Sequence, residues 1–297
     1  MVRPDISDYF AAVKTGRSKW WHWLVGAALI VAFYFLCNFI VVFAGYAIAG
    51  DDFMEGLSGY AFLAISFLPL FFGLFLVQKY WHKRPGLALL TSARRFRWGH
   101  FWHGILAVVI VIAVSLILTA LFFPEDLQDL TLNPDIGLVI KAAFITLLFI
   151  PFQAASEEIF LRGYVNQALI GYLRSPWLVF IVTSALFASL HLANPEAEGQ
   201  VWPYMAVIFM FGIAACVLLY YEGGIESAIG MHIANNVFAF SIIGYEDPDL
   251  PDTALYNSGE PVITWPDAGL EALSLFAVVA LTLWLNRRGL NRRVAGR

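Results

Sequence analysis

The stretch LVIKAAFITLLFIPFQAASEEIFLRG, residues 138–163, decides the fold, because it is apolar enough to cross a lipid bilayer yet ends with two adjacent glutamates and an arginine. A transmembrane helix needs about 20 predominantly apolar residues. Ionisable side chains within such a helix are rare and usually functional, since a charge is costly in hydrocarbon. The stretch therefore predicts a membrane helix with a buried polar site at Glu157, Glu158 and Arg162.

The composition of the whole chain agrees with a membrane protein. Of its 297 residues, 60% are hydrophobic and only 13% are charged, whereas a soluble domain carries about 25% charged residues. The apolar stretches are continuous and lack the two-residue alternation of barrel strands. We expect an all-α, polytopic membrane helix bundle of about eight transmembrane helices with no β domain. The predicted helices cover residues 21–49, 59–80, 101–123, 138–160, 176–192, 201–221, 225–244 and 268–286.

The distribution of charges predicts the orientation of these helices. Every Lys and Arg except Lys141 falls on one side of them, and the loops on the other side are acidic. Loops rich in Lys and Arg remain in the cytoplasm. We therefore expect a multi-pass protein of the cell membrane with both termini cytoplasmic. The basic faces should meet anionic lipid headgroups, and the net charge of −4 predicts no nucleic-acid partner.

The predicted helices divide the chain into one membrane domain with short tails. Aromatic residues alternate with basic residues in the loop 78–100, which is typical of an interfacial helix. The expected divisions are a cytoplasmic tail at 1–19, transmembrane helices within 20–135 that include the basic cytoplasmic loop 78–100, a catalytic core at 136–245, an outer loop at 246–267, a last helix at 268–286 and a basic cytoplasmic tail at 287–297.

Two predicted helices form a hairpin that brings Glu157 and His191 together. Both residues are equally distant in sequence from Arg174, where the hairpin turns, so they should lie at the same depth. Glu158 and Arg162 are four residues apart and can pair on one helix face. Glu157 is rotated by about 100° from Glu158. We therefore expect Arg162 to neutralise Glu158 and leave Glu157 free to point at His191.

A further predicted helix carries His232 and Asn236, which are one turn apart on a single face. A neutral imidazole and a carboxamide that converge on one point can donate hydrogen bonds to a developing oxyanion. A carboxylate beside a histidine in a desolvated pocket can activate water as a general base. These groups together predict a peptidase that cleaves by water attack and needs no serine or cysteine nucleophile.

Three motifs resemble those of the CPBP intramembrane protease family. They are Glu-Glu-x-x-x-Arg at 157–162, Phe-x-x-x-His at 187–191 and His-x-x-x-Asn at 232–236, and each lies on a separate predicted helix. That family includes the type II CAAX prenyl endopeptidases and the bacterial Abi-like bacteriocin-processing and immunity proteins. The resemblance implies an endopeptidase that acts near the C-terminus of a lipidated or membrane-associated peptide, which is prenylated in the eukaryotic branch.

The resemblance also implies a role for each motif residue. Glu157 would activate the attacking water with help from His191, and His232 and Asn236 would form the oxyanion hole. Glu158 and Arg162 would support the site or read the substrate. The family has been described both as metalloproteases and as metal-independent glutamate proteases.

The residues leave the question of a cofactor open. Glu157, His191 and His232 have the chemistry of three Zn²⁺ ligands with an open fourth position. Asn236 is a poor zinc ligand and a good oxyanion donor, which favours metal-free hydrolysis. Zn²⁺ is thus the candidate cofactor of one alternative, and the other alternative needs none.

Other functions are compatible with the same residues. Buried Glu and His side chains also form proton relays in transporters, although the sequence shows no inverted repeat of broken helices. A non-catalytic scaffold could keep the same site geometry. Glu158 and Arg162 could form a purely structural ion pair, and His232 and Asn236 could be hydrogen-bonding contacts between helices. Gln153 is expected only to pack or to line a cavity.

Overall fold

The computed structural model describes residues 6–194, 197, 200–245, 251–259 and 263–295, and these are mostly helical. Arg3, Glu196, Glu198 and Arg297, which contribute to the predicted orientation, lie outside the described residues, as does part of the predicted outer loop. The α-helices are α1 (Ile6–Ala11), α2 (Trp20–Ala49), α3 (Gly56–Ile65), α4 (Leu68–Leu76), α5 (Trp98–Phe122), α6 (Ile136–Glu158), α7 (Asn166–Leu173), α8 (Pro176–Ser189), α9 (Val201–Glu222), α10 (Glu226–Ser241) and α11 (Trp265–Ala295).

The predicted polytopic helix bundle is confirmed, but the count of eight spans is not. Among the described residues, six helical spans are long and apolar enough to cross a membrane. The helix α8 has 14 residues, which is about 21 Å at 1.5 Å per residue, against a hydrocarbon core of about 30 Å. The helix α10 has 16 residues, and every residue from Glu226 to His232 is buried. Both helices are therefore too short to cross the core fully.

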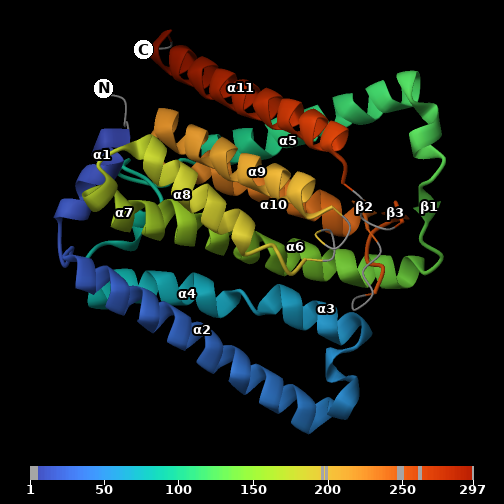
Figure 1. Ribbon diagram of the computed structural model, residues 1–297, viewed down its shortest axis with the longest axis horizontal. Helices are drawn as coiled ribbons and strands as arrows, with labels where there is room; N and C mark the ends of the chain where they lie inside the picture. The colour runs from blue at the N-terminus through green and yellow to red at the C-terminus, as the bar shows by residue number, and fades with distance from the viewer. Residues whose placement is uncertain (1–5, 195–196, 198–199, 246–250, 260–262, 296–297) are drawn as a thin grey trace.

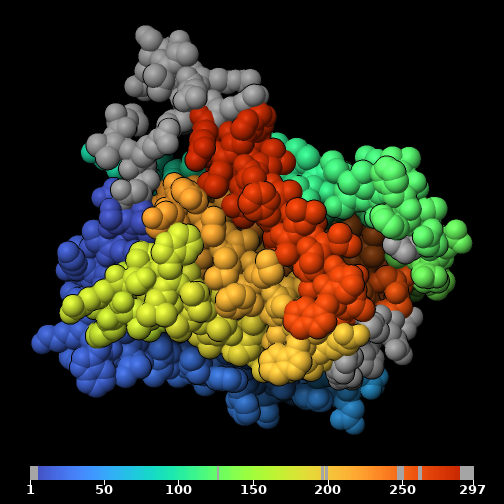
Figure 2. All heavy atoms as spheres, turned by 45° about the horizontal axis from the view of Figure 1, so that its top comes forward, coloured from blue at the N-terminus to red at the C-terminus, as the bar shows by residue number. Residues whose placement is uncertain are grey.

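The helices are arranged around α10, which packs against α5, α6 and α9 (Figure 1). On one side of this centre, α3 and α4 pack against α6, and α2 packs on α4. On the opposite side, α11 packs on α5 and α9. Figure 2 shows α8, α9 and α11 side by side over one face of the bundle. Of the three motif-bearing helices, α10 is thus the central one, whereas α6 and α8 each keep an exposed apolar face.

The contact between α5 and α10 is unusually close because glycines face it. A Cβ added to Gly104 would lie 2.2 Å from the Ser227 carbonyl oxygen, and one added to Gly230 would lie 2.1 Å from the Phe101 carbonyl oxygen. Small residues allow the backbones of membrane helices to approach in this way. The glycines therefore set the position of α10, the helix that carries His232.

We expect Gly230→Ala to destabilise the protein, because the added methyl group must push α10 away from α5. Overpacking of this kind costs about 1–3 kcal/mol, and thermal unfolding of the purified protein in detergent measures it. Gly269→Ala in α11 is the matched control, since an added Cβ there meets nothing within 4 Å. Equal melting temperatures for the two variants would contradict the close packing of α5 and α10.

In the part of the chain that the structure describes, the β-structure is confined to three two-residue strands, which agrees with the expected all-α class. The strands β1 (Thr131–Leu132), β2 (Ile243–Gly244) and β3 (Tyr256–Asn257) form one small sheet in the order β1-β3-β2. The pairing of β1 with β3 is antiparallel, and that of β2 with β3 is parallel. The sheet joins the loop before α6 to the segment that follows α10.

The expected interfacial helix in the loop 78–100 is not found, and that prediction was wrong. The loop begins within a π-helical turn (Val77–Trp81), contains a 3₁₀ turn (Gly86–Leu89) and has no α-helix before α5. Its aromatic and basic pattern is misleading because part of it is buried. His82 is fully buried, and its Nε2 lies 3.0 Å from the Tyr164 hydroxyl. The loop thus packs into the bundle beside the helical segment that follows α6.

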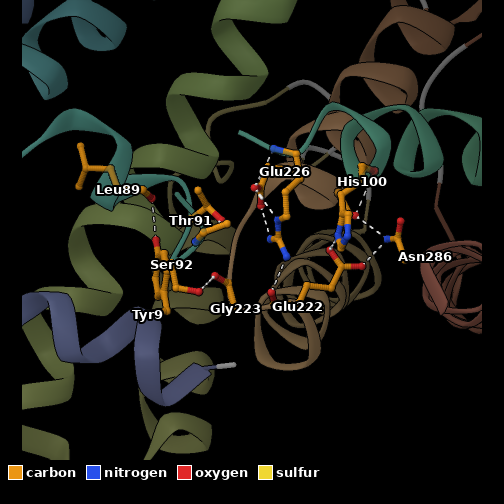
Figure 3. Close-up of polar contacts among 12 residues, drawn as sticks. Tyr9, Leu89, Thr91, Ser92, His100, Glu222, Gly223, Glu226 and Asn286 are labelled. Atoms are coloured by element: carbon orange, nitrogen blue, oxygen red, sulfur yellow. Dashed lines mark hydrogen bonds and ion pairs between the residues drawn. The ribbon is translucent and has the colours of Figure 1, made fainter. Parts of the chain in front are cut away.

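A polar network holds the turn between α9 and α10 (Figure 3). Nε of Arg97 donates to the buried Glu226 carboxylate at 2.8 Å, and its NH1 donates to the Glu222 carbonyl oxygen at 2.7 Å. The Glu222 carboxylate lies 3.1 Å from Nδ1 of His100 and accepts from Asn286 at 2.6 Å. The network links α9 and α10 to the start of α5 and to α11, and so fixes the beginning of α10.

Candidate active site

The paired glutamates lie where α6 changes its helical geometry. The chain continues from Glu158 into a π-helical turn, Ile159–Val165, before α7 begins. Such wide turns occur often at functional sites. Within it, a Cβ on Gly163 would lie 2.8 Å from the Leu89 carbonyl oxygen, so the loop packs closely against this turn. Arg162 lies in the same turn and is fully buried.

The expected pair between Glu158 and Arg162 is present and has a third member. NH1 of Arg162 lies 3.2 Å from Oε1 of Glu158, and both side chains are fully buried. Nδ1 of His232 lies 2.9 Å from the same carboxylate oxygen. The Arg162 guanidinium also lies 4.6 Å from the centre of the Phe187 ring, which is a cation–π contact. Glu158 therefore connects Arg162 to the histidine of α10.

These contacts determine which nitrogen of His232 carries a proton. The adjacent arginine favours the ionised form of Glu158, and an ionised carboxylate only accepts hydrogen bonds. Nδ1 of His232 must then donate, so Nε2 carries a proton only when the ring is cationic. Nε2 lies 3.6 Å from Oε2 of Glu157. In this arrangement a neutral His232 cannot donate a hydrogen bond to an oxyanion through Nε2. This differs from the role expected from the sequence, in which a neutral imidazole donates that hydrogen bond.

The second glutamate, Glu157, is linked to Asn236 through Gln153. Nε2 of Gln153 donates to Oε1 of Glu157, and Oε1 of Gln153 accepts from Nδ2 of Asn236 at 2.9 Å. Gln153 comes from α6, one turn before Glu157, and Asn236 comes from α10. The structure thus brings Glu157, His232 and Asn236 together on one side of the contact between α6 and α10.

His191 lies just beyond the end of α8, and its Nδ1 is 2.8 Å from the Phe187 carbonyl oxygen. A carbonyl oxygen only accepts, so Nδ1 donates and Nε2 keeps a lone pair. His191 and Glu157 are both described in the structure, and no direct hydrogen bond or ion pair joins them. Both of them line the same cavity. The Phe187 ring packs against His191 and His232, with centroid distances of 4.5 and 5.9 Å.

The cavity has a volume of about 580 Å³ and is mostly apolar. Its walls come from α2, α3, α4, α6, α10 and the end of α8, and aliphatic and aromatic side chains such as Phe35, Phe67 and Leu190 dominate them. Gln153, Glu157 and His191 are among the few polar groups on its surface. A carboxylate therefore faces an apolar space within the predicted membrane region.

The side chains of Glu157, His191 and His232 do not gather around one metal position. Within the described part of the chain, no group of three or more His, Cys, Asp or Glu side chains is placed to hold a metal ion. Both ring nitrogens of His232 face carboxylates, and Nδ1 of His191 is hydrogen-bonded to the backbone. Glu157, His191 and His232 therefore do not fit a shared Zn²⁺ in this arrangement.

The fold places a cluster of glutamate, histidine and amide side chains inside a helical membrane protein, and part of the chain is similar to a known family of such proteins. Residues 139–238, about a third of the chain, match the family model described as Type II CAAX prenyl endopeptidase Rce1-like. The three motifs lie within this segment, so the resemblance predicted from them is confirmed there. The matched family is a protease family.

One curated relative aligns beyond this segment. The chain is 26% identical over 226 residues to the uncharacterized protein YyaK of Bacillus subtilis, and the alignment covers 74% of this chain and 73% of the relative. The similarity extends past the motif-bearing helices, although the relative's name assigns it no activity. No solved structure matches the chain.

Sequence reasoning missed two contacts of the site. Gln153 was expected only to pack or to line a cavity, although its spacing of four residues from Glu157 places both on one face of α6. The contact between Glu158 and His232 joins helices that are far apart in the sequence, so no local pattern could have revealed it.

Proposed function

We propose that this protein is an intramembrane endopeptidase that hydrolyses a peptide bond with a water molecule activated by Glu157. One observation carries the proposal. The Glu157 carboxylate faces an apolar cavity, lies 3.6 Å from His232 and is joined through Gln153 to Asn236. A general base must be within hydrogen-bond reach of the proton it removes, directly or through one water. A water in the cavity beside Glu157 meets this condition.

In the proposed reaction, the water oxygen attacks the carbonyl carbon of the peptide while its proton moves to Glu157. His191 assists by accepting a hydrogen bond from the water at Nε2. The oxyanion accepts hydrogen bonds from Asn236 and from Nε2 of His232 in its protonated form. The carbon–nitrogen bond then breaks, and the proton on Glu157 is transferred to the leaving amine. Glu158 and Arg162 hold His232 in the orientation that this requires.

The proposed substrate is a lipidated or membrane-associated peptide cut near its C-terminus. An apolar cavity of about 580 Å³ can hold a lipid chain or an apolar peptide segment beside Glu157. The matched family model is described as a type II CAAX prenyl endopeptidase, which supports a substrate of this kind. Membrane lipids surround the exposed apolar faces of helices such as α2 and α5, where Phe39, Phe43 and Leu121 are largely exposed.

We propose that the protein resides in the cell membrane and that both termini face the cytoplasm, on the basis of the basic residues that collect on one side of the helices. The helix α1 and the C-terminal part of α11 lie at the same end of the bundle (Figure 1), which is consistent with both ends of the chain on one side of the membrane. A reporter enzyme that functions only in the cytoplasm should be active when fused after Arg297. Activity confined to a reporter that functions only outside the cytoplasm would contradict the orientation.

The proposed function is tested by cleavage of a fluorescence-quenched peptide that carries a farnesylated cysteine near its C-terminus. The purified protein in detergent or proteoliposomes is compared with Glu157→Gln, and each is measured with and without a chelator followed by Zn²⁺. Loss of turnover in Glu157→Gln together with indifference to the chelator is the expected result.

A further inference from the structure

Gln153 is a polar residue that none of the three motifs contains. It lies in α6, one turn before Glu157, in a helix that is otherwise apolar around it. A carboxamide in an apolar environment is costly unless it is hydrogen-bonded. Gln153 satisfies this need by contacting two residues of the proposed machinery, Glu157 and Asn236, and it lines the cavity beside Glu157.

The direction of these hydrogen bonds suits an ionised Glu157, which is the form that the proposed general base requires. An ionised carboxylate only accepts, so Gln153 must present its amide nitrogen to Glu157 and its carbonyl oxygen to Asn236. Asn236 must then present its own amide nitrogen to Gln153. Consistent with this, Nδ2 of Asn235 donates to Oδ1 of Asn236 at 3.3 Å. The carboxylate therefore sets the orientation of an amide on another helix through Gln153.

We propose that Gln153 is a positioning residue that aligns the Glu157 carboxylate and the Asn236 carboxamide for the same reaction. The proposal rests on the proposed function. The hydrogen bond to Oε1 of Glu157 leaves Oε2 directed toward His232, where the water must be activated. The hydrogen bond from Asn236 fixes its rotamer and leaves one of its two N–H groups for the oxyanion. Gln153 thus couples the base on α6 to the oxyanion donor on α10.

A purely structural role would have different consequences. If Gln153 only held α6 against α10, its loss would lower the stability of the fold and leave the turnover of each folded molecule unchanged. If it positions the two groups, its loss would lower kcat and leave substrate binding almost unchanged, because the many apolar side chains of the cavity wall, and not the two hydrogen bonds of Gln153, would hold the substrate. The split between kcat and KM therefore separates the two roles.

The test uses Gln153→Met, which keeps the length of the side chain and removes both hydrogen bonds. The matched control is Thr146→Val in the same helix, which removes the buried hydrogen bonds of Thr146 with Tyr60 and the Ala142 carbonyl oxygen. With the farnesylated peptide, we expect kcat of Gln153→Met to fall about 10- to 100-fold while KM stays within about twofold, since small misplacements at a reacting centre cost up to about 10² in rate. Thr146→Val should keep both constants.

A double variant tests whether Gln153 acts through Asn236. Residues that act through one another give losses smaller than the product of the single losses. Adding Gln153→Met to Asn236→Ala should therefore reduce kcat by less than Gln153→Met does alone. A fully multiplicative loss, or a Gln153→Met variant with wild-type kcat per folded molecule, would overturn the positioning role. If Glu157→Gln is inactive at the same time, the proposed function still stands, and only the role of Gln153 fails.

Discussion

Glu157→Gln is expected to lose about 10²–10⁴-fold in kcat with the farnesylated peptide, because a carboxamide cannot accept the proton of the attacking water. The substitution keeps the shape of the side chain and a carbonyl oxygen that can accept from Gln153. Folding should therefore be preserved, and substrate binding should change little. The measurement is steady-state turnover normalised to folded, monodisperse protein, together with direct binding of the peptide.

The matched control is Glu271→Gln, the same carboxyl-to-amide change in α11, which does not line the cavity. It should keep wild-type turnover. If Glu157→Gln also kept wild-type turnover, the protease proposal would fail at its centre, and a proton-coupled transporter or a non-catalytic scaffold would become the leading interpretation. If activity disappeared with the chelator and returned with Zn²⁺, Glu157, His191 and His232 would have to be reassigned as metal ligands that converge in a different arrangement.

Arg162→Ala is expected to have the largest effect on stability. Arg162 is fully buried against Glu158 and lies over the Phe187 ring. Removing one partner of a buried ion pair leaves an uncompensated charge and costs about 3–5 kcal/mol. We expect a much lower yield of folded protein and a lower melting temperature. The exposed Arg95 provides the control, because Arg95→Ala removes the same side chain without a buried partner.

A second variant separates the charge from the lost packing. In the double variant Glu158→Gln with Arg162→Ala, no carboxylate is left without its partner at this position, so part of the lost stability should return. This recovery would show that the destabilisation comes from the Glu158 charge. A melting temperature for Arg162→Ala equal to that of Arg95→Ala would show instead that the pair does not stabilise the fold. Recovery of folding need not restore turnover, because Glu158 also orients His232.

Much of the site could be predicted from local spacing. The pair of Glu158 and Arg162 follows from their four-residue separation, since neighbours at that spacing share a helix face whatever the rest of the chain does. The turn of the hairpin at Arg174 could also be predicted locally, from the two residues that follow it, Ser175 and Pro176. The structure ends α7 at Leu173 and starts α8 at Pro176, with Ser175 as its N-cap.

Contacts between helices could not be predicted, because they depend on the rotation and crossing of packed helices. The sequence suggested that Glu157 would meet His191. The structure instead places Glu157 beside His232 and Gln153, and His191 shares only the cavity with it. The contact between Glu158 and His232 is a second example of this kind. It matters for the chemistry, because the position of Glu158 determines which nitrogen of His232 carries a proton.

The sequence by itself determined that this protein is a polytopic helical membrane protein, since long apolar segments and the spacing of charges along one helix are properties of the chain alone. Only the tertiary structure decided that the loop 78–100 packs into the bundle and that Gln153 joins Glu157 to Asn236. The physical reason is that these features depend on which helix faces meet. That is decided by packing of small residues such as Gly104 and Gly230 and by hydrogen bonds between distant segments.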